Sequence, residues 1–334
     1  MNAVSKKLIK ISGVVAVVIL ALLLPLIFRN DFYLNGLVST YMYAIMALGL
    51  VLVLVTGRLS LGQVGFFAIG AYASALMVTR LGISFWLALP LAGIIAGIFG
   101  LTIGLIIIRR SGITFIMMTW AFAEVINQVI GNQTSVLGGR GGIIGIPSPN
   151  PINFGLVTVN FHSVVAYYYL ILVLLILVAL FLWRLYQSRY GTVLRSLNQA
   201  DKLAQSLGVD IVKYRLFAFS LAAVITGLAG SFYAHYLHYI NPSYFDITVS
   251  VNVLVYSIIG GVYNFIAGPM VGTVVLTTLS NLLVSLVSYK SIIYGVALIA
   301  ITLFLSGGLA SLPRFVLDRI KRKRYETVRS DKPE

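Results

Sequence analysis

The sequence predicts an all-α fold, a polytopic bundle of about eight to ten transmembrane helices with its N and C termini in the cytoplasm. Three observations predict it. Hydrophobic residues make up 59% of the 334 positions and charged residues only 10%, whereas about 25% of the residues in soluble domains are charged. Long apolar runs cover most of the chain, and one span needs about 20 apolar residues. Positive charge is concentrated in alternate loops.

Composition also excludes several classes of protein. So apolar a chain is not a soluble enzyme of any fold. An outer-membrane barrel would show short segments of alternating hydrophobicity. This chain has long unbroken apolar runs instead, which excludes such a barrel. Cysteine is absent, which excludes disulfides, thiolate metal sites and cysteine nucleophiles. The chain has no His-Glu-x-x-His motif, so we expect no metal site and no cofactor.

Glycine, proline and charged residues divide the apolar runs into ten spans. The expected spans are residues 8–28, 33–56, 65–80, 84–108, 113–131, 162–183, 215–239, 247–263, 266–287 and 290–308. The first five end at Arg29, Gly57-Arg58, Arg80, Arg109-Arg110 and a stretch rich in glycine, proline and asparagine. The only long polar segment separates the sixth span from the seventh.

Three regions follow from these spans. Residues 1–32 are expected to hold an uncleaved N-terminal helix, because no small-residue cleavage site follows it. Residues 33–312 form the membrane core, with an external loop at 132–162 and a cytoplasmic segment at 186–214. Residues 313–334 form a basic cytoplasmic tail.

The distribution of lysine and arginine gives the orientation. With this topology, twenty of the 24 lysine and arginine residues fall in the two terminal segments and in the alternate loops on the same side. The other side holds only Arg29, Arg80, Arg140 and Lys290. Short cytoplasmic loops retain positive charge, so both termini are expected inside. The net charge of +15 therefore reflects topology, and we expect no nucleic-acid partner.

Small residues recur four apart within the predicted spans. The pairs are Gly93/Gly97, Gly100/Gly104 and Gly268/Gly272. This spacing lets helix backbones approach closely. It predicts tight packing but no particular function.

A polar interruption follows the second span. Ser60-Leu61-Gly62-Gln63 comes directly after Thr56, Gly57 and Arg58. Irregular backbone at membrane depth is tolerated where it lines a cavity, so Ser60 and Gln63 are candidates for a solute path. The alternative is an ordinary tight turn at the cytoplasmic surface.

Glu124 is the only acid well inside a predicted span. Intramembrane acids are costly and often mark a transport path. Thr119, Asn127 and Gln128 lie within one or two helical turns, and we expect them to share an inward polar face with Glu124. Thr119 and Glu124 are therefore path candidates. The alternative for Glu124 is a hydrogen-bonded packing role near the outer interface.

The external loop is rich in glycine and proline. A shaped surface that receives a partner or gates an entrance is one interpretation, and a flexible linker is the other. The candidate residues for the first are Gly138, Gly139, Arg140, Gly142 and Pro147. No Gly-Lys-Ser/Thr motif occurs, so any ATP that drives this protein binds on another subunit.

Histidine and tyrosine alternate at the end of the seventh span. His235 and His238 lie among Tyr233, Tyr236 and Tyr239. An aromatic belt at the membrane interface explains this pattern. A metal pair or a proton relay is the less favoured alternative.

The cytoplasmic segment has an amphipathic pattern. Leu194, Leu197, Leu203 and Leu207 are expected to form one apolar stripe on a pair of short helices. Such an element suits docking of a cytoplasmic motor, and the candidate residues are Arg195, Asp201, Ala204 and Gly208. The alternative is a helix that lies among lipid headgroups.

Several of these blocks resemble one family in order and spacing. Residues 56–63, Thr-Gly-Arg-Leu-Ser-Leu-Gly-Gln, and 66–72, Phe-Phe-Ala-Ile-Gly-Ala-Tyr, look like the early signature of the LivM-type membrane subunits of branched-chain amino-acid ABC importers. Residues 121–124 and the glycines near 140 resemble the middle block of that family. Gly227-Leu228-Ala229-Gly230 and Gly260-Gly261 extend the likeness.

The resemblance implies a transport subunit that is not itself an enzyme. Its expected partners are a second homologous permease subunit, two cytoplasmic ATPase subunits that hydrolyse ATP, an external solute-binding protein and the lipid bilayer. The expected location is the bacterial cytoplasmic membrane. The expected cargo is branched-chain or other apolar amino acids, and the alternatives are urea, short amides or sugars. An ion-coupled secondary transporter is a further alternative.

Overall fold

The computed structural model describes most of the membrane core. The described residues are 19–26, 30–153, 158–161, 163–199, 201–206, 208–262 and 264–282, with positions 292, 295, 296, 299, 308 and 309. Residues 19–26 are helical and belong to the first expected span. Most of the first and tenth spans, and the whole basic tail, lie outside the described residues.

The all-α expectation is confirmed. Within the described ranges, six helices are long and apolar enough to cross a membrane. They are α2 (Asp31–Leu54), α4 (Phe85–Ile107), α5 (Gly112–Asn132), α7 (Val164–Gln187), α10 (Ile211–Leu237) and the stretch Pro242–Gly260, which combines η2 (Pro242–Phe245) with α11 (Ile247–Gly260). Two shorter apolar helices, α3 (Gln63–Thr79) and α12 (Ala267–Leu282), match the third and ninth expected spans.

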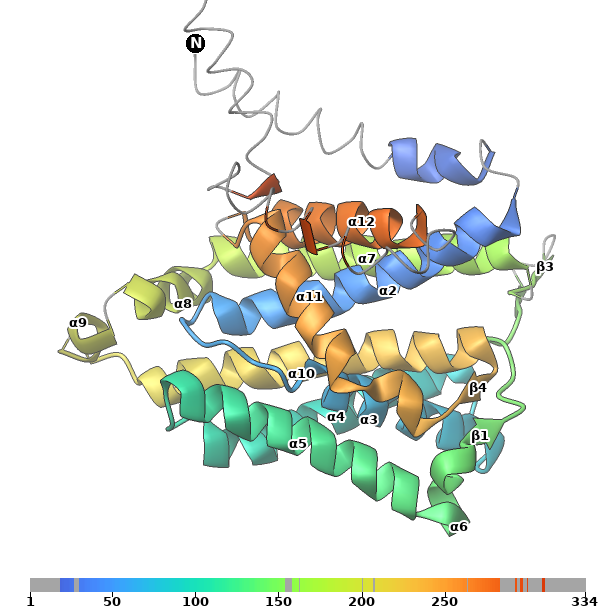
Figure 1. Cartoon of the computed structure of the whole chain (residues 1–334), viewed down its shortest axis with the longest axis horizontal. Helices are drawn as coiled ribbons and strands as arrows, with labels where there is room; N and C mark the ends of the chain where they lie inside the picture. The colour runs from blue at the N-terminus through green and yellow to red at the C-terminus, as the bar shows by residue number, and fades with distance from the viewer. Residues whose placement is uncertain are drawn as a thin grey trace, which may run out of the picture.

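The remaining elements lie at the two ends of the bundle (Figure 1). One end carries α8 (Arg189–Gln199) and α9 (Asp201–Ser206). The other carries α6 (Thr134–Leu137), η1 (Gly139–Gly141) and the two-residue strands β1 (Ile143–Ile144), β2 (Ile152–Asn153), β3 (Thr158–Val159) and β4 (Tyr239–Ile240). β1 pairs with β4 and β2 with β3, both antiparallel.

Helix α10 is the central element of the core. It contacts α2, α3 and α4 along its length, while α7 and α12 cover the opposite side of α2 and α11 crosses the bundle obliquely (Figure 1). Most of α2 is buried, including the continuous run from Ala44 to Val53. A helix that is apolar all round belongs in the interior of a bundle, which explains why α2 has no polar face.

Close glycine packing holds α10 in place, as the four-residue spacing predicts. The glycines of α4 at 93, 97, 100 and 104 all face α10, where an added Cβ would lie within 2.9 Å of an α10 side chain. On α3, a Cβ at Gly70 would lie 2.1 Å from the carbonyl oxygen of Gly227. A Cβ at Gly230 would lie 2.0 Å from the carbonyl oxygen of Phe67. Backbone touches backbone at these points, so no larger residue fits.

Helix α3 begins inside the bundle. After α2 ends, residues 55–62, which we call the strap, turn back toward the centre of the bundle (Figure 1). The carbonyl of Thr56 accepts hydrogen bonds from Arg215 near the start of α10, whereas Gln63 bonds to Thr226 in the middle of α10. With a rise of 1.5 Å per residue, the strap spans about 16 Å along α10. The helix break is therefore deep in the bundle and is not a turn confined to the surface.

Basic residues gather at one end of the bundle. Arg58 donates to the carbonyl of Arg110, and Arg215 and Arg195 bond to the carbonyls of Thr56 and Tyr186 at this end. At the opposite end, Arg80 donates to Ser135. The folded chain thus keeps the charge asymmetry on which the orientation depends. Which end faces the cytoplasm stays a prediction.

We predict that Gly230→Ala destabilises the bundle by about 1–3 kcal/mol, the usual range for an overpacked core, because the new methyl group would force α10 away from α3. Thermal unfolding of the detergent-solubilised protein measures this. Gly141→Ala is the matched control, since nothing lies within 4 Å of a Cβ there. Equal melting temperatures for the two variants would contradict the packing argument.

Candidate transport path and coupling segment

Hydroxyl groups from three elements satisfy the start of α3. The residue before this helix is Gly62, which has no side chain to cap it. The backbone N–H of Leu61 donates to Thr119 Oγ1 of α5 at 3.1 Å, that of Gly62 to Ser60 Oγ at 3.2 Å, and that of Val64 to Ser250 Oγ of α11 at 2.9 Å. Helix N-termini leave backbone donors without intrahelical partners. These hydroxyls replace the missing cap.

Gln63 completes this polar centre. Its side chain is fully buried, and its Oε1 accepts a hydrogen bond from Thr226 Oγ1 of α10 at 2.7 Å. Its Nε2 makes no hydrogen bond with any residue that the structure describes. An amide nitrogen carries two donors, so Gln63 offers hydrogen-bond capacity at the centre of the bundle.

The structure brings Ser60, Gln63 and Thr119 together and adds Thr226 and Ser250, which the sequence analysis missed. A single hydroxyl in a long apolar span is common, because it can bond to a carbonyl of its own helix. Neither residue lies in a motif, so no local signal sets it apart.

Glu124 lies elsewhere, and the expectation of a single inward polar face on α5 is wrong. Thr119 is buried toward the strap, whereas Glu124 and Gln128 point outward. Successive residues of a helix are about 100° apart, so a spacing of five residues places two side chains on different faces. Asn127 takes a third direction and donates to the carbonyls of Pro242 and Phe245 in η2.

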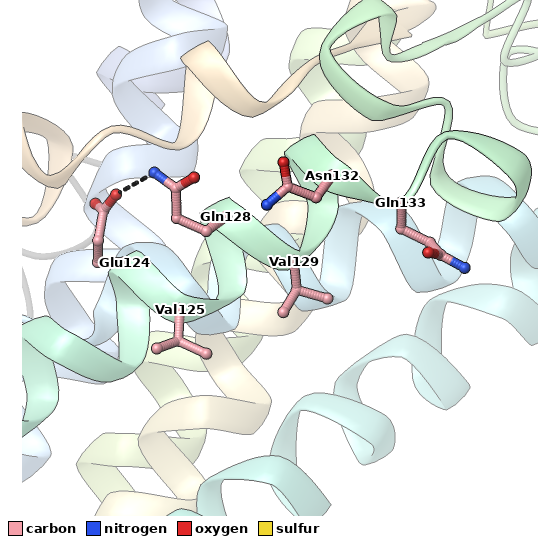
Figure 2. Close-up of a pocket in the computed structure, with 6 residues that line it drawn as sticks. All are labelled: Glu124, Val125, Gln128, Val129, Asn132 and Gln133. Carbon is pink, nitrogen blue, oxygen red and sulfur yellow. Dashed lines mark hydrogen bonds between the residues drawn. The ribbon is translucent and has the colours of Figure 1, made fainter.

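The outward face of α5 carries a polar stripe, which we define as Glu124, Gln128 and Asn132. All three are exposed, and Gln128 Nε2 donates to Glu124 Oε1 at 2.8 Å (Figure 2). With Val125, Val129 and Gln133 they line a shallow depression that is formed by α5 and its C-terminal end alone (Figure 2). The stripe is therefore an open surface in the isolated chain.

The outward faces of the neighbouring long helices differ from this stripe. Large apolar side chains are exposed along α4 and α7, among them Leu87, Ile98, Leu177 and Phe181. The exposed Arg184 and Gln187 lie in the last turn of α7. Apolar faces of this kind suit contact with lipid. A row containing a carboxylate and two amides is expensive in lipid, so the outward face of α5 calls for another covering.

The external loop is ordered by backbone contacts to α10 and β4. A Cβ at Gly142 would lie 2.0 Å from the carbonyl oxygen of Ile240, and one at Gly138 would lie 2.0 Å from that of Gly142. Gly139 is buried, while Arg140 is exposed beside it. Residues 138–147 are thus a shaped surface, which disagrees with the flexible-linker alternative. Whether they receive a partner stays a prediction.

His235 binds the end of this loop through a hydrogen bond to Pro147. It is fully buried, which contradicts its assignment to an aromatic belt. Its Nδ1 bonds to the carbonyl of Pro147 at 2.7 Å, and its Nε2 to Ser74 Oγ at 3.0 Å, which in turn accepts from Ser231 Oγ at 2.7 Å. A carbonyl only accepts, so Nδ1 is the donor and Nε2 accepts from Ser74. His238 bonds to the carbonyl of Ile146.

This arrangement uses both histidines for structure. The bonds from His235 to Pro147 and Ser74 occupy both of its ring nitrogens. Among the described residues, no group of three metal-binding side chains comes together.

The segment expected in the cytoplasm forms two short helices, α8 and α9, as predicted. Leu194, Leu197 and Ala204 are buried, while Leu207 and the side chains of Asp201 and Leu203 lie outside the described residues. The Arg195 guanidinium donates to the carbonyls of Gly191 and Tyr186, so it stabilises the end of α7. Its predicted contact with an ATPase therefore involves a side chain that already has a structural role.

Gly208 and Asp210 connect α9 to α10. Gly208 has a φ of 82°, a left-handed conformation that glycine adopts without strain. Asp210 caps α10 by accepting from the backbone N–H of Lys213 at 3.2 Å. This hydrogen bond, together with the Lys213 ammonium group, holds the pKa of the Asp210 carboxyl below its usual value.

Comparison with known proteins agrees with these features. Residues 32–302 match the family described as the branched-chain amino acid transport system permease component. The chain belongs to this family. The permease is 30% identical over 294 residues to the high-affinity branched-chain amino acid transport system permease protein LivM of Salmonella typhimurium, covering 82% of this chain and 69% of that protein.

Two further relatives show the same relationship. LivM of Escherichia coli is 29% identical over 296 residues, with the same coverage of both chains. The probable branched-chain amino acid transport permease protein LivH of Methanocaldococcus jannaschii is 26% identical over 246 residues, which cover 71% of the permease and 76% of LivH. No solved structure matches the chain.

We predict that His235→Phe loosens the external loop while the bundle stays folded. The ring is retained, but Ser74 and the carbonyl of Pro147 each lose a buried partner at a cost of about 1–3 kcal/mol. Hydrogen–deuterium exchange should therefore rise across residues 138–147. His238→Ala, which removes only the bond to Ile146, is the comparison. Unchanged protection in His235→Phe would show that the loop is held by other contacts.

Proposed function

We propose that this permease works as one of two homologous permease subunits in an ATP-driven importer of branched-chain or other apolar amino acids. Two cytoplasmic ATPase subunits and an external solute-binding protein complete the assembly, which lies in a bacterial cytoplasmic membrane. The permease binds no nucleotide itself, so ATP hydrolysis belongs to the partner subunits.

The polar stripe on α5 is the observation that carries this proposal. Glu124, Gln128 and Asn132 are exposed on a helix long enough to span a membrane, and such a face needs a partner protein or water beside it. A second permease subunit opposite α5 would enclose a polar path for a zwitterionic solute. Glu124 lines this path, and Ser60 and Gln63 lie behind α5 at the inner end of the strap.

The two ends of the bundle supply the other contacts. Helices α8 and α9 receive the ATPase, through a surface that includes Asp201 and the exposed Gly208. Ala204 is buried, so its part in coupling is through packing. At the opposite end, the ordered glycine loop, from Gly138 to Pro147, presents Arg140 and the 79% exposed Ile144 to the solute-binding protein.

Reconstitution tests the proposed function directly. The permease is placed in vesicles with its second permease, the ATPases and the binding protein, and uptake of labelled leucine is measured. ATP supplied to the ATPase side should drive uptake, and collapse of the proton gradient should leave it unchanged. A hydrolysis-deficient ATPase is the control. Uptake that follows an ion gradient without ATP would identify a secondary transporter instead.

Competition identifies the cargo in the same vesicles. Valine and isoleucine should compete with leucine at similar concentrations. Competition only by urea, short amides or sugars would reassign the substrate and keep the ATP-driven mechanism.

Two variants at Gly208 test the role of the cytoplasmic segment in coupling ATP hydrolysis to uptake. Gly208→Val forces a β-branched residue into a left-handed conformation, at a cost of about 1–2 kcal/mol, whereas asparagine tolerates it. We expect Gly208→Val to lower uptake per ATP hydrolysed and Gly208→Asn to stay close to wild type. Coupling that is equal in the two variants would remove Gly208 from the transmission of motion.

A further inference from the structure

The strap touches the cytoplasmic segment at its outer end. Gly57 has a φ of 76°, and a Cβ added there would lie 3.2 Å from Oδ1 of Asn198 in α8. The preceding carbonyl, of Thr56, accepts from Nη2 and Nε of Arg215 at 3.2 and 3.4 Å. The strap therefore begins beside α8 and is bonded to the first turns of α10.

The strap is also bonded to the first two turns of α5 and to the loop before this helix. Arg58 is only 8% exposed, and its guanidinium lies 5.5 Å from the centre of the Phe115 ring while it donates to the carbonyl of Arg110. One helical turn further along α5, Thr119 Oγ1 accepts from the backbone N–H of Leu61 and donates to the carbonyl of Ile116. Arg58 and Leu61 of the strap thus both hold the start of α5.

Over this half, α5 also packs through two buried rings, Phe115 against Phe219 of α10 and Phe122 against Phe66 of α3. Its outward face is exposed, and its hydrogen bonds to η2 come from Asn127, nearer the opposite end. Toward the core it packs on α3, where a Cβ at Gly65 would lie 3.4 Å from that of Ala123. A displacement of the strap would therefore reach α5 through Arg58 and Leu61.

We propose that the strap carries movement of α8 to α5, and that Thr119 is the positioning residue that receives it. This inference rests on the proposed function, since α8 belongs to the surface that receives the ATPase and α5 lines the path. Gly57, which has no Cβ, lets the strap lie close beside Asn198, and the hydroxyl of Thr119 joins the strap to the helix that carries the polar stripe.

Thr119→Val and Thr119→Ser test the role of the hydroxyl. Valine keeps the shape and removes the acceptor for Leu61, whereas serine keeps the acceptor. In the reconstituted complex, Thr119→Val should lower leucine uptake per ATP about tenfold, the size of effect expected when a buried donor loses its partner. ATP hydrolysis should continue, and Thr119→Ser should restore coupling. Wild-type coupling in Thr119→Val would overturn the proposal.

A redox experiment tests whether the strap and α5 move together. The chain contains no cysteine, so two introduced thiols are its only ones. A Cβ at Gly62 would lie 3.4 Å from that of Thr119, close to the separation in disulfides. The double variant Gly62→Cys/Thr119→Cys should be uncoupled when reduced, because it lacks the hydroxyl. Oxidation should recover coupling, because a covalent bond replaces the hydrogen bond.

Two controls accompany this pair. Gly97→Cys/Val224→Cys joins α4 to α10, with a Cβ separation of 3.9 Å, and should transport equally in both redox states. Gly62→Ala fills the gap beside Thr119 without forming a bond and should stay coupled.

The outcomes separate the two proposals. An oxidised Gly62→Cys/Thr119→Cys pair that stays uncoupled, or a reduced pair that is fully coupled, would overturn the strap mechanism. If the wild-type complex shows no ATP-dependent uptake, the proposed function itself fails.

Discussion

Every backbone polar group inside a membrane needs a partner within the protein, and the strap is where this constraint is most severe. After the last turn at residues 55–57, residues 58–61 run through the bundle as irregular backbone. Helix α3 then begins with backbone donors that have no partner within the helix. Thr119, Ser60 and Ser250 satisfy them, and each comes from a different element. Non-helical backbone is tolerated at membrane depth only where protein or water surrounds it. The helix break therefore brings α3, α5 and α11 together.

The centre of the bundle depends on a second constraint, the exclusion of side chains. Lipid provides no hydrophobic driving force between helices, so close van der Waals packing and hydrogen bonds hold them together. Gly70, Gly227 and Gly230 bring the backbones of α3 and α10 into contact, and the glycine row of α4 does the same on another side. Tightly packed α10 thus provides a fixed frame for the helices around it.

The polar side chains of the permease have different roles at the two ends of the bundle and in its middle. Carbonyl groups bind the arginines at one end, and the histidines fasten the glycine loop at the other. Between them, the Gln63 amide faces inward and the stripe of α5 faces outward. Family membership and the relatives LivM and LivH agree with a transport role for this arrangement. The proposed second subunit would cover the polar outward face of α5, which suits lipid poorly.

By itself, the sequence determined the fold class, the alternation of charge between the two ends, the helix break near Ser60 and the pair of short helices near Arg195. These features depend on the length of apolar runs, on local charge and on glycine, all of which are properties of neighbouring residues. Only the tertiary structure decided which way each polar side chain points. Thr119 and Glu124 lie on one helix but face different surroundings, and the partners of Gln63 and His235 come from residues more than 80 positions away. Such pairings depend on how helices pack, because a helix presents every face and its neighbours select the one that is buried.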